Sequence, residues 1–132
     1  MKNKKSIVAV DDSGIILKML EKLLGGEYAY YGFSKGLRAL KYLKEAYTPD
    51  LIILDIEMPE IDGYQMLDMI RKKEELKEVP VLFLTSNNDK EHVVKAIKAG
   101  ANDYIVKPID ENAFMDKVRH LLKEEKYSWD NV

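Results

Sequence analysis

The amino-acid sequence predicts an α/β domain: a doubly wound, five-stranded parallel sheet with helices on both faces. The first observation behind this prediction is that short apolar runs recur along the chain, which is typical of strands covered on both faces. The second is that segments with the period of an amphipathic helix lie between these runs. Such an alternating order requires parallel strands joined by right-handed crossovers.

The first strand and helix are expected within residues 6–26. Residues 7–10 are apolar throughout, as in a buried strand. The helix that follows can be capped by Ser13 and ended by Gly25 and Gly26. Its predicted core face consists of Ile16, Leu20, Leu23 and Leu24.

The second strand, residues 28–33, is less apolar than the others, so we expect it nearer an edge of the sheet. The second helix begins near Ser34 and ends at Thr48 and Pro49, because proline does not continue a helix. Its period predicts a core face made of Leu37, Leu40, Leu43 and Tyr47.

The third and fourth strands are the apolar runs 51–54 and 81–84. The third helix follows Asp62 and Gly63, and its predicted core face consists of Met66, Leu67 and Ile70. The fourth helix follows residues 88–89 and ends near Gly100, with a predicted core face made of Val93, Val94 and Ile97.

The fifth strand is expected at residues 104–106, and the fifth helix follows Asp110. The predicted core face of this helix consists of Phe114, Val118, Leu121 and Leu122. We expect one domain over residues 1–123, because a chain of 132 residues buries one adequate core. Residues 124–132 form a tail that is polar apart from Tyr127 and Trp129, and we expect it to fray.

The composition excludes several classes of protein. The chain has no cysteine, so it has neither a disulfide framework nor a thiolate metal site, which suits a reducing compartment. No apolar run approaches the ~20 residues of a membrane span, and the basic start precedes only a strand-length apolar stretch. A net charge of -2 with both signs interspersed provides no basic stripe for direct nucleic-acid binding. We therefore expect a cytoplasmic protein that does not bind membranes.

Four of the expected strands end in polar residues: Asp11 with Asp12, Asp55, Thr85 with Ser86, and Lys107 with Pro108. Ligands of parallel α/β sheets bind outside the carboxyl ends of the strands, so we expect these side chains to meet at one rim. Each residue alone has an ordinary structural explanation, such as helix capping by Asp12. Two acids about 4 Å apart cost on the order of 4 kcal/mol at a surface-like dielectric, so a cation, Lys107 or protonation must relieve them.

The predicted rim offers only oxygen ligands, since His92 and His120 lie on predicted helices away from it. Oxygen ligands favour Mg²⁺ or Ca²⁺ over zinc or copper, and the absence of a twelve-residue calcium loop favours Mg²⁺. A carboxylate beside Mg²⁺, with a lysine and a hydroxyl for the other oxygens of an incoming anion, predicts phosphoryl transfer onto an aspartate. Spacing alone does not decide which of the three acids is the nucleophile.

Together these residues resemble the receiver domain of bacterial two-component response regulators, over residues 6 to about 123. The resemblance rests on Asp11 with Asp12, on DIEMPEIDG at 55–63, on Thr85 with Ser86, and on Lys107 with Pro108. Each motif alone is weak, but all four in order at the ends of the expected strands are highly specific. The resemblance implies a flavodoxin-like strand order 2-1-3-4-5. It also implies a phospho-acceptor of the stand-alone chemotaxis-regulator type.

The resemblance further implies a role for each acidic residue of the site. Asp55 matches the phosphorylated aspartate, and Asp12 and Asp55 match the carboxylates that hold Mg²⁺. Asp11 would act on the metal chiefly through a water molecule. Glu57 matches the position whose backbone carbonyl is a further ligand.

Four other positions also match the family. Lys107 matches the lysine that pairs with the acids and the phosphoryl group, and its bond to Pro108 is usually cis in the family. Thr85 matches the hydroxyl that moves toward the phosphoryl group, and Tyr104 matches the switch aromatic. Asn87, like Glu57, occupies a position that varies in the family and tunes the lifetime of the phosphoryl group, which the sequence leaves open.

The function implied by the resemblance is that of a phosphorelay switch and not of an enzyme with its own substrate. The phosphoryl group would come from a sensor histidine kinase, a phosphotransfer protein or a small phosphodonor. Its arrival would switch the surface of the fourth helix, fifth strand and fifth helix, expected within residues 90–100 and 110–119. The partner would be a downstream protein or an output domain outside these residues, and a phosphorylation-dependent dimer stays open.

Three other functions compete with this interpretation. A haloacid-dehalogenase-like phosphatase would carry an aspartate where this chain has Glu57, and often a cap domain. A flavin or nucleotide binder would require a phosphate-binding loop after the first strand, where Asp11 and Asp12 repel phosphate in the absence of a metal. A pseudo-receiver that serves only as a scaffold would lack an essential acid or lysine, and none is missing here.

Overall fold

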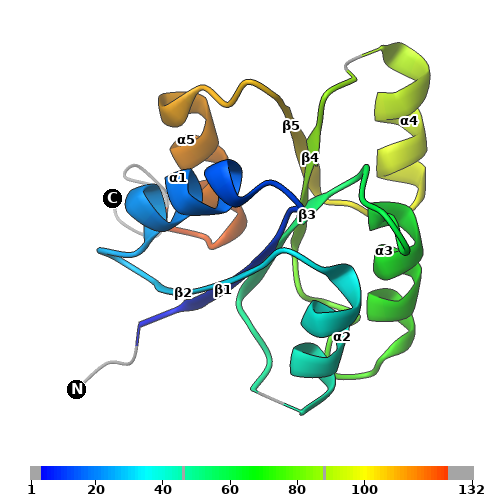
Figure 1. Ribbon diagram of the computed structural model, residues 1–132, viewed down its shortest axis with the longest axis horizontal. Helices are drawn as coiled ribbons and strands as arrows, with labels where there is room; N and C mark the ends of the chain where they lie inside the picture. Colours follow the sequence, from blue (N-terminus) through cyan, green and yellow to red (C-terminus); the bar gives the residue numbers. More distant parts are fainter. Residues whose placement is uncertain (1–3, 46, 88, 125–132) are drawn as a thin grey trace.

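In the computed structural model, which describes residues 4–45, 47–87 and 89–124, five parallel strands form one sheet in the order β2-β1-β3-β4-β5. Strands and helices alternate along the chain (Figure 1): β1 (Ser6–Val10), α1 (Gly14–Leu24), β2 (Ala29–Phe33), α2 (Gly36–Glu45), β3 (Leu51–Asp55), α3 (Gly63–Lys72), β4 (Val81–Thr85), α4 (Lys90–Lys98), β5 (Asp103–Val106) and α5 (Glu111–Leu121). The predicted fold class and strand order are confirmed, including the position of β2 at an edge.

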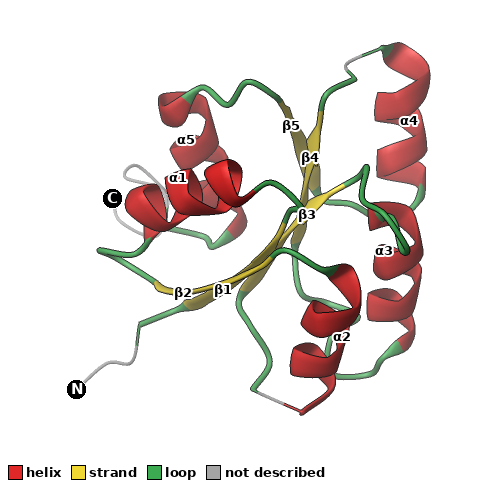
Figure 2. Ribbon diagram, in the orientation of Figure 1, coloured by secondary structure: helices red, strands yellow, loops and turns green. Residues whose placement is uncertain are grey.

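Helices cover both faces of the sheet, with α1 and α5 on one face and α2, α3 and α4 on the other (Figure 2). All residues of β3 and β4 are buried, because these strands lie inside the sheet and beneath both helix layers. The core under α1 and α5 includes Leu20, Phe114 and Val118. The core under the other three helices includes Leu43, Met66 and Phe83.

Side chains cap the helices at the positions that the sequence suggests. The Ser13 hydroxyl accepts a hydrogen bond from the backbone N–H of Ile16 at the start of α1. Asp62 and Gln65 form a reciprocal capping box at the start of α3. The predicted core faces of α1, α3 and α5 are confirmed, with Ile16, Leu23 and Leu121 half-buried.

The prediction for the core face of α2 is wrong at two of its four positions. Leu37 and Tyr47 are 54% and 96% exposed, and the helix ends at Glu45, before Thr48 and Pro49. Two small residues of α2, Gly36 and Ala39, are buried instead, because α2 lies close to the loop that follows β3. A Cβ atom on Gly36 would come within 2.6 Å of Ile61 Cγ2. Helical period alone therefore predicts that Leu37 faces the core, whereas the helix packs through the smaller Gly36.

The prediction for α4 is also wrong in part. Val94 and Ile97 are 40% and 48% exposed, and the buried residue of the helix is Ala96, with Val93 half-buried beside it. A helix that packs through an alanine lies close to its neighbours, and its larger apolar side chains then stay at the margin of the contact.

Two other expectations concern the chain as a whole. Within the described ranges, the longest helices have 11 residues, and none is long and apolar enough to cross a bilayer. Of the expected tail, residues 125–132, with Tyr127 and Trp129, lie outside the described residues.

Candidate functional site

Three carboxylates lie together at the carboxyl-terminal end of the sheet. Asp11 and Asp12 follow β1, and Asp55 is the last residue of β3. Because β1 and β3 are parallel neighbours, their ends deliver these side chains to one place. One oxygen atom from each of the three carboxylates lies within 4.8 Å of the others. Asp11 and Asp55 are buried, whereas Asp12 is exposed.

Lys107, which follows β5, brings a positive charge to these acids. Its Nζ atom lies 2.8 Å from Asp11 Oδ2 and 3.3 Å from Asp55 Oδ1. Burial alone would lower the pKa of Lys107, but its contacts with Asp11 and Asp55 outweigh burial and raise the pKa. The lysine is therefore held as a cation. Its peptide bond to Pro108 is cis.

Asp55 is held in a position that disfavours its charge. Its side chain is almost fully buried, and the backbone N–H of Glu57 donates a hydrogen bond of 3.3 Å to its Oδ1 atom. Burial, followed by the negative charge of Asp11, raises the pKa of Asp55 to about 7, against the opposing effect of Lys107. Asp55 is therefore harder to ionise than an exposed aspartate, even beside Lys107.

The residues of the site fit a divalent cation. The donors are carboxylate oxygens, which hard cations such as Mg²⁺ prefer. Three carboxylates face one ammonium, an excess of two negative charges when all the acids are ionised. Asp11 lies at the bottom of the site with no exposed surface, and its Oδ1 atom accepts a hydrogen bond from the backbone N–H of Ser13. A divalent ion would relieve the repulsion that raises the pKa of Asp55.

Thr85, the last residue of β4, forms its side-chain hydrogen bonds with the loop that follows it. Its hydroxyl donates to the carbonyl of Asn87 and accepts a hydrogen bond from the N–H of Asn87, both at 3.0 Å. The hydroxyl is thus engaged by its own loop. This role of Asn87 was missing from the sequence analysis, because a backbone contact leaves no signal in residue type.

Tyr104 on β5 contacts the core and a side chain of α5. Its ring is half-buried and packs against the core beneath α2, α3 and α4. The ammonium of Lys117 on α5 lies 5.2 Å from the ring centroid and 2.9 Å from Asp103 Oδ1. Tyr104 is therefore in contact with a helix that borders the β5 edge.

Gly63 supports the site in a way that the sequence analysis did not identify. A Cβ atom at this position would lie 2.7 Å from the backbone oxygen of Asp55 and 2.8 Å from the Cα atom of Ile56. The N–H of Gly63 also donates to the carbonyl of Ile56. Any side chain here would displace the backbone that carries Asp55. The signal in the sequence that could have indicated this close approach is a glycine directly after the N-cap residue Asp62.

An open hollow of 310 Å³ lies beside Asp12, between the loops that follow β2 and β3. Lys35, Met58 and Pro59 are among the residues that line it. The exposed side of the acid cluster is thus accessible from solvent, and a ligand can approach the carboxylates there.

Comparisons with known proteins agree with this arrangement. The family model of the response regulator receiver domain matches residues 7–119. The transcriptional regulatory protein AfsQ1 of Streptomyces coelicolor is 34% identical over 129 residues, which cover 96% of this chain and 56% of that protein. The two-component response regulator ARR10 of Arabidopsis thaliana is 31% identical over 91% of this chain and 22% of its own length. The chain spans between 17% and 56% of the length of eight of its curated relatives.

Solved structures show the same fold over nearly their whole length. A putative response regulator from Chloroflexus aurantiacus superposes with a TM-score of 0.85 and 31% identity, over 92% of this chain and 99% of that one. The chemotaxis protein CheY4 of Vibrio cholerae superposes with a TM-score of 0.83 and 27% identity, over 89% of this chain and 98% of that one.

Proposed function

This chain belongs to the response regulator receiver family, and from that membership we propose that it accepts a phosphoryl group on Asp55 and thereby changes its α4–β5–α5 surface. Receiver domains are signalling switches of two-component systems, which receive phosphoryl groups from histidine kinases and act on downstream targets. The observation that carries the proposal is the group of three carboxylates in which Lys107 contacts both Asp11 and Asp55.

The chemistry is a displacement at phosphorus. A carboxylate oxygen of Asp55 forms a bond to the phosphorus atom while the bond from phosphorus to the donor breaks, and the electron pair leaves with the donor. Asp55 is the acid that suits this role, because it lies between Asp12 and Lys107 at the end of a central strand. The exposed side of the site, next to Asp12, gives the donor its approach.

The charge of the transferring group requires positive partners. Lys107 is held as a cation beside Asp55, within reach of an oxygen of the incoming group. Mg²⁺, held by Asp12, Asp55 and the backbone carbonyl of Glu57, with Asp11 acting through water, would supply the remaining positive charge. The lack of a side chain at Gly63 leaves room for the backbone that carries Asp55.

The response to phosphorylation would begin at Thr85. A phosphoryl oxygen on Asp55 competes with the backbone of Asn87 for the Thr85 hydroxyl. Movement of this hydroxyl opens space behind it for Tyr104, whose ring contacts Lys117 on α5. The equilibrium between two arrangements of α4, β5 and α5 then shifts, and the downstream partner recognises one of them.

Labelling with ³²P-acetyl phosphate and Mg²⁺ tests the proposal. We expect stoichiometric incorporation that is labile to hydroxylamine in the wild type and absent in Asp55→Asn, because the amide is a poor nucleophile. Asp68→Asn is the matched control, since Asp68 is an exposed acid on α3 that is paired with Lys72. This control should be labelled like the wild type.

Two results would contradict the proposal. Labelling that persists in Asp55→Asn would assign the phosphoryl group to another residue. Many turnovers of a generic phosphate ester would indicate a phosphatase instead of a switch. Calorimetric titration with Mg²⁺ provides a separate measurement, in which the binding signal should be lost in Asp12→Ala.

A further inference from the structure

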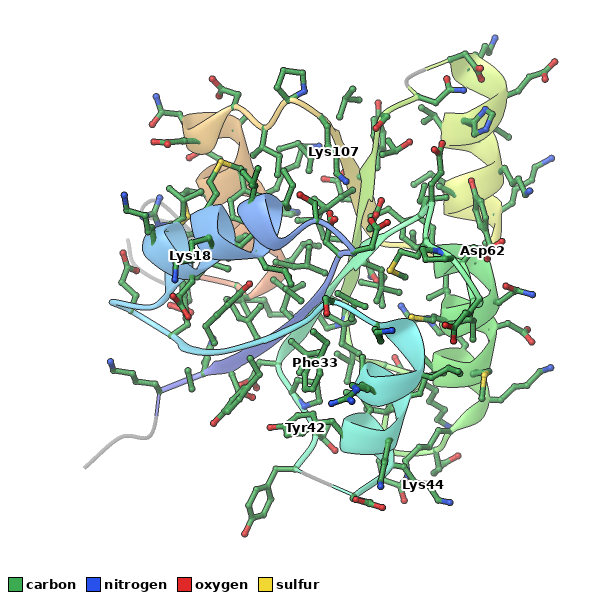
Figure 3. The ribbon with its side chains drawn as sticks, in the orientation of Figure 1. Lys18, Phe33, Tyr42, Lys44, Asp62 and Lys107 are labelled. Carbon is green, nitrogen blue, oxygen red and sulfur yellow. The ribbon has the colours of Figure 1, made fainter. Side chains whose placement is uncertain are left out.

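A groove of 590 Å³ lies between α2 and α3, and the proposed phosphorylation does not involve it. Its apolar lining consists of Leu40, Leu43, Met69, Ile70 and Leu76. Leu43, Ile70 and Leu76 are buried at its base, whereas Met69 is 52% exposed. In Figure 3, Lys44 of this groove lies on the far side of the molecule from Lys107.

The packing of α2 explains why the groove is open. At its first residue, Gly36, α2 lies against Ile61 and Met66, so that even a methyl group would not fit. Toward its other end the contact residues are leucines, and the space between them and α3 is not filled. The volume is in the range of ordinary binding clefts, which is about 300–1,000 Å³. Met69 at its rim is a flexible residue that can adapt to different side chains.

The rim of the groove is basic on both sides. Lys41 and Lys44 line it from α2, and Lys73 lines it from the end of α3, against a single acid, Glu45. Lys41 and Lys44 form no ion pair with any residue in the described part of the chain. Among the described residues, Lys73 forms one ion pair, in which its Nζ atom lies 3.7 Å from Glu75 Oε2. This local positive excess contrasts with the net charge of -2 of the whole chain.

We propose that this groove binds an amphipathic segment of a partner protein, with apolar side chains at helical spacing and acidic residues on both flanks of that stripe. The apolar floor takes the stripe, and the lysines on α2 and α3 pair with the two acidic flanks. A second copy of this chain is a poor occupant, because a symmetric contact would bring two sets of lysines together. The groove lies away from Asp55, so the inference does not depend on the proposed function.

A synthetic peptide provides the probe. We would use a fluorescein-labelled helix with leucines at i, i+3, i+4 and i+7 flanked by glutamates, and a matched peptide with lysines in place of the glutamates. Fluorescence anisotropy with the full chain should show at least tenfold tighter binding of the glutamate peptide. The double variant Lys41→Glu with Lys44→Glu should lose at least tenfold in affinity for the glutamate peptide and prefer the lysine peptide.

Three controls make the test specific to the groove. Lys18→Glu with Lys22→Glu makes the same charge change on α1, on the opposite face, and should bind the glutamate peptide like the wild type. Asp55→Asn should also bind like the wild type, so a failure of the phosphorylation proposal would not affect this result. Circular dichroism checks that each variant is folded. Amide chemical shifts should change along α2 and α3 when the peptide is added.

Several outcomes would overturn the proposal. Equal affinity for the two peptides, or loss of binding in the Lys18 and Lys22 variant, would place the contact elsewhere. A dimer that dissociates in the Lys41 and Lys44 variant would make a second copy the occupant. Binding to phosphatidylglycerol vesicles without binding to the peptide would make the groove a membrane contact. If the emission of Trp129 in the Lys41 and Lys44 variant differs from that of the wild type in the absence of peptide, the chain's own tail would be the occupant.

Discussion

At the amino-terminal end of the sheet, the guanidinium of Arg71 donates hydrogen bonds to three backbone carbonyls and to the side chain of Asn102, whereas at the carboxyl-terminal end three carboxylates share the ammonium of Lys107. At the amino-terminal end a cation therefore meets neutral acceptors, whereas at the carboxyl-terminal end three like charges lie close together. The difference teaches that contacts which stabilise the fold and a cluster of charges which repel one another lie at opposite ends of the strands.

The contacts of Arg71 join two connections that are far apart in sequence. Its donors reach the carbonyls of Leu76 and Val79, between α3 and β4, at 3.3 and 2.7 Å. They also reach Gly100, after α4, at 3.0 Å. Asn102 Oδ1 accepts from Arg71 at 3.0 Å and from the N–H of Val81 at 2.9 Å. A planar group with five N–H donors suits this arrangement, and a lysine does not.

The largest effect is expected when the amino-terminal end is broken. Arg71→Ala should lower the free energy of unfolding by about 3 kcal/mol, because the partly buried carbonyls of Leu76 and Val79 and two exposed acceptors lose a charged donor at once. Arg71→Lys should recover only a small part of this loss. Urea unfolding measures both variants.

The neighbouring residue provides the control for Arg71. Lys72 forms an exposed ion pair with Asp68, so Lys72→Ala should cost no more than about 0.5 kcal/mol. If Arg71→Ala lowers the free energy of unfolding by no more than Lys72→Ala does, water replaces the hydrogen bonds of the arginine at no cost. The two ends of the sheet would then not differ in the way that the contacts indicate.

The second effect has the opposite sign and concerns the carboxyl-terminal end. Asp55→Asn should raise the free energy of unfolding of the metal-free protein by about 2 kcal/mol at pH 8. This is half of the ~4 kcal/mol that a rise of about three pKa units corresponds to, because an amide replaces the protonated acid imperfectly. The raised pKa of about 7 means that the folded state holds the proton on Asp55 more tightly than the unfolded chain does. Stability of the wild type therefore falls as the pH rises from about 4 to about 7, whereas the amide stays neutral throughout.

Urea unfolding in EDTA at pH 4 and pH 8 measures this difference. The increase in the free energy of unfolding that Asp55→Asn causes should be almost absent at pH 4 and complete above pH 7. Mg²⁺ should reduce the difference in stability between Asp55→Asn and the wild type at pH 8, because an ion that binds the folded wild type stabilises it. Asp68→Asn should show no such gain, since Asp68 is exposed. An Asp55→Asn variant that is less stable than the wild type at pH 8 would mean that Lys107 compensates fully for burial.

The two ends also differ in how far the sequence could predict them. The strands that deliver Asp11, Asp55 and Lys107 are short apolar runs, and parallel strands bring their carboxyl ends to one edge, so the meeting of these residues follows from pattern alone. Arg71 carries no comparable signal, because it reads as an ordinary basic residue near the end of α3. Its partners are backbone carbonyls in loops, whose positions depend on the tertiary fold.

The errors in the helix faces have a related cause. Period identifies a helix, but it does not say whether large or small residues approach the sheet. Gly36 and Ala96 pack where the helices lie close to their neighbours, so Leu37, Val94 and Ile97 are exposed. The contact of Thr85 with the backbone of Asn87 likewise follows from the loop conformation and not from residue type.

The smallest effect comes from an ordinary acid at the same carboxyl-terminal end. Asp89 caps α4 and is exposed, and the hydrogen bond from the backbone N–H of His92, followed by the contact with its ring, lowers the pKa of Asp89. An acid with a lowered pKa stabilises the fold above its usual pKa, and this contribution is lost as the pH falls through the lowered value. Asp89→Asn keeps the cap but removes the charge, so its melting temperature should lie slightly below that of the wild type at pH 6.

Thermal unfolding of Asp89→Asn against pH sharpens the contrast with Asp55. As the pH falls below 4, the difference from the wild type should close, because Asp89 itself then becomes neutral. Raising the pH thus adds stability through Asp89 and removes it through Asp55, although both acids lie at the same end of the sheet. A difference for Asp89→Asn that stays constant from pH 6 to pH 2 would assign its effect to cap geometry and not to charge. Burial, followed by the negative charge of Asp11, and not the location at this end, is what makes Asp55 costly to ionise.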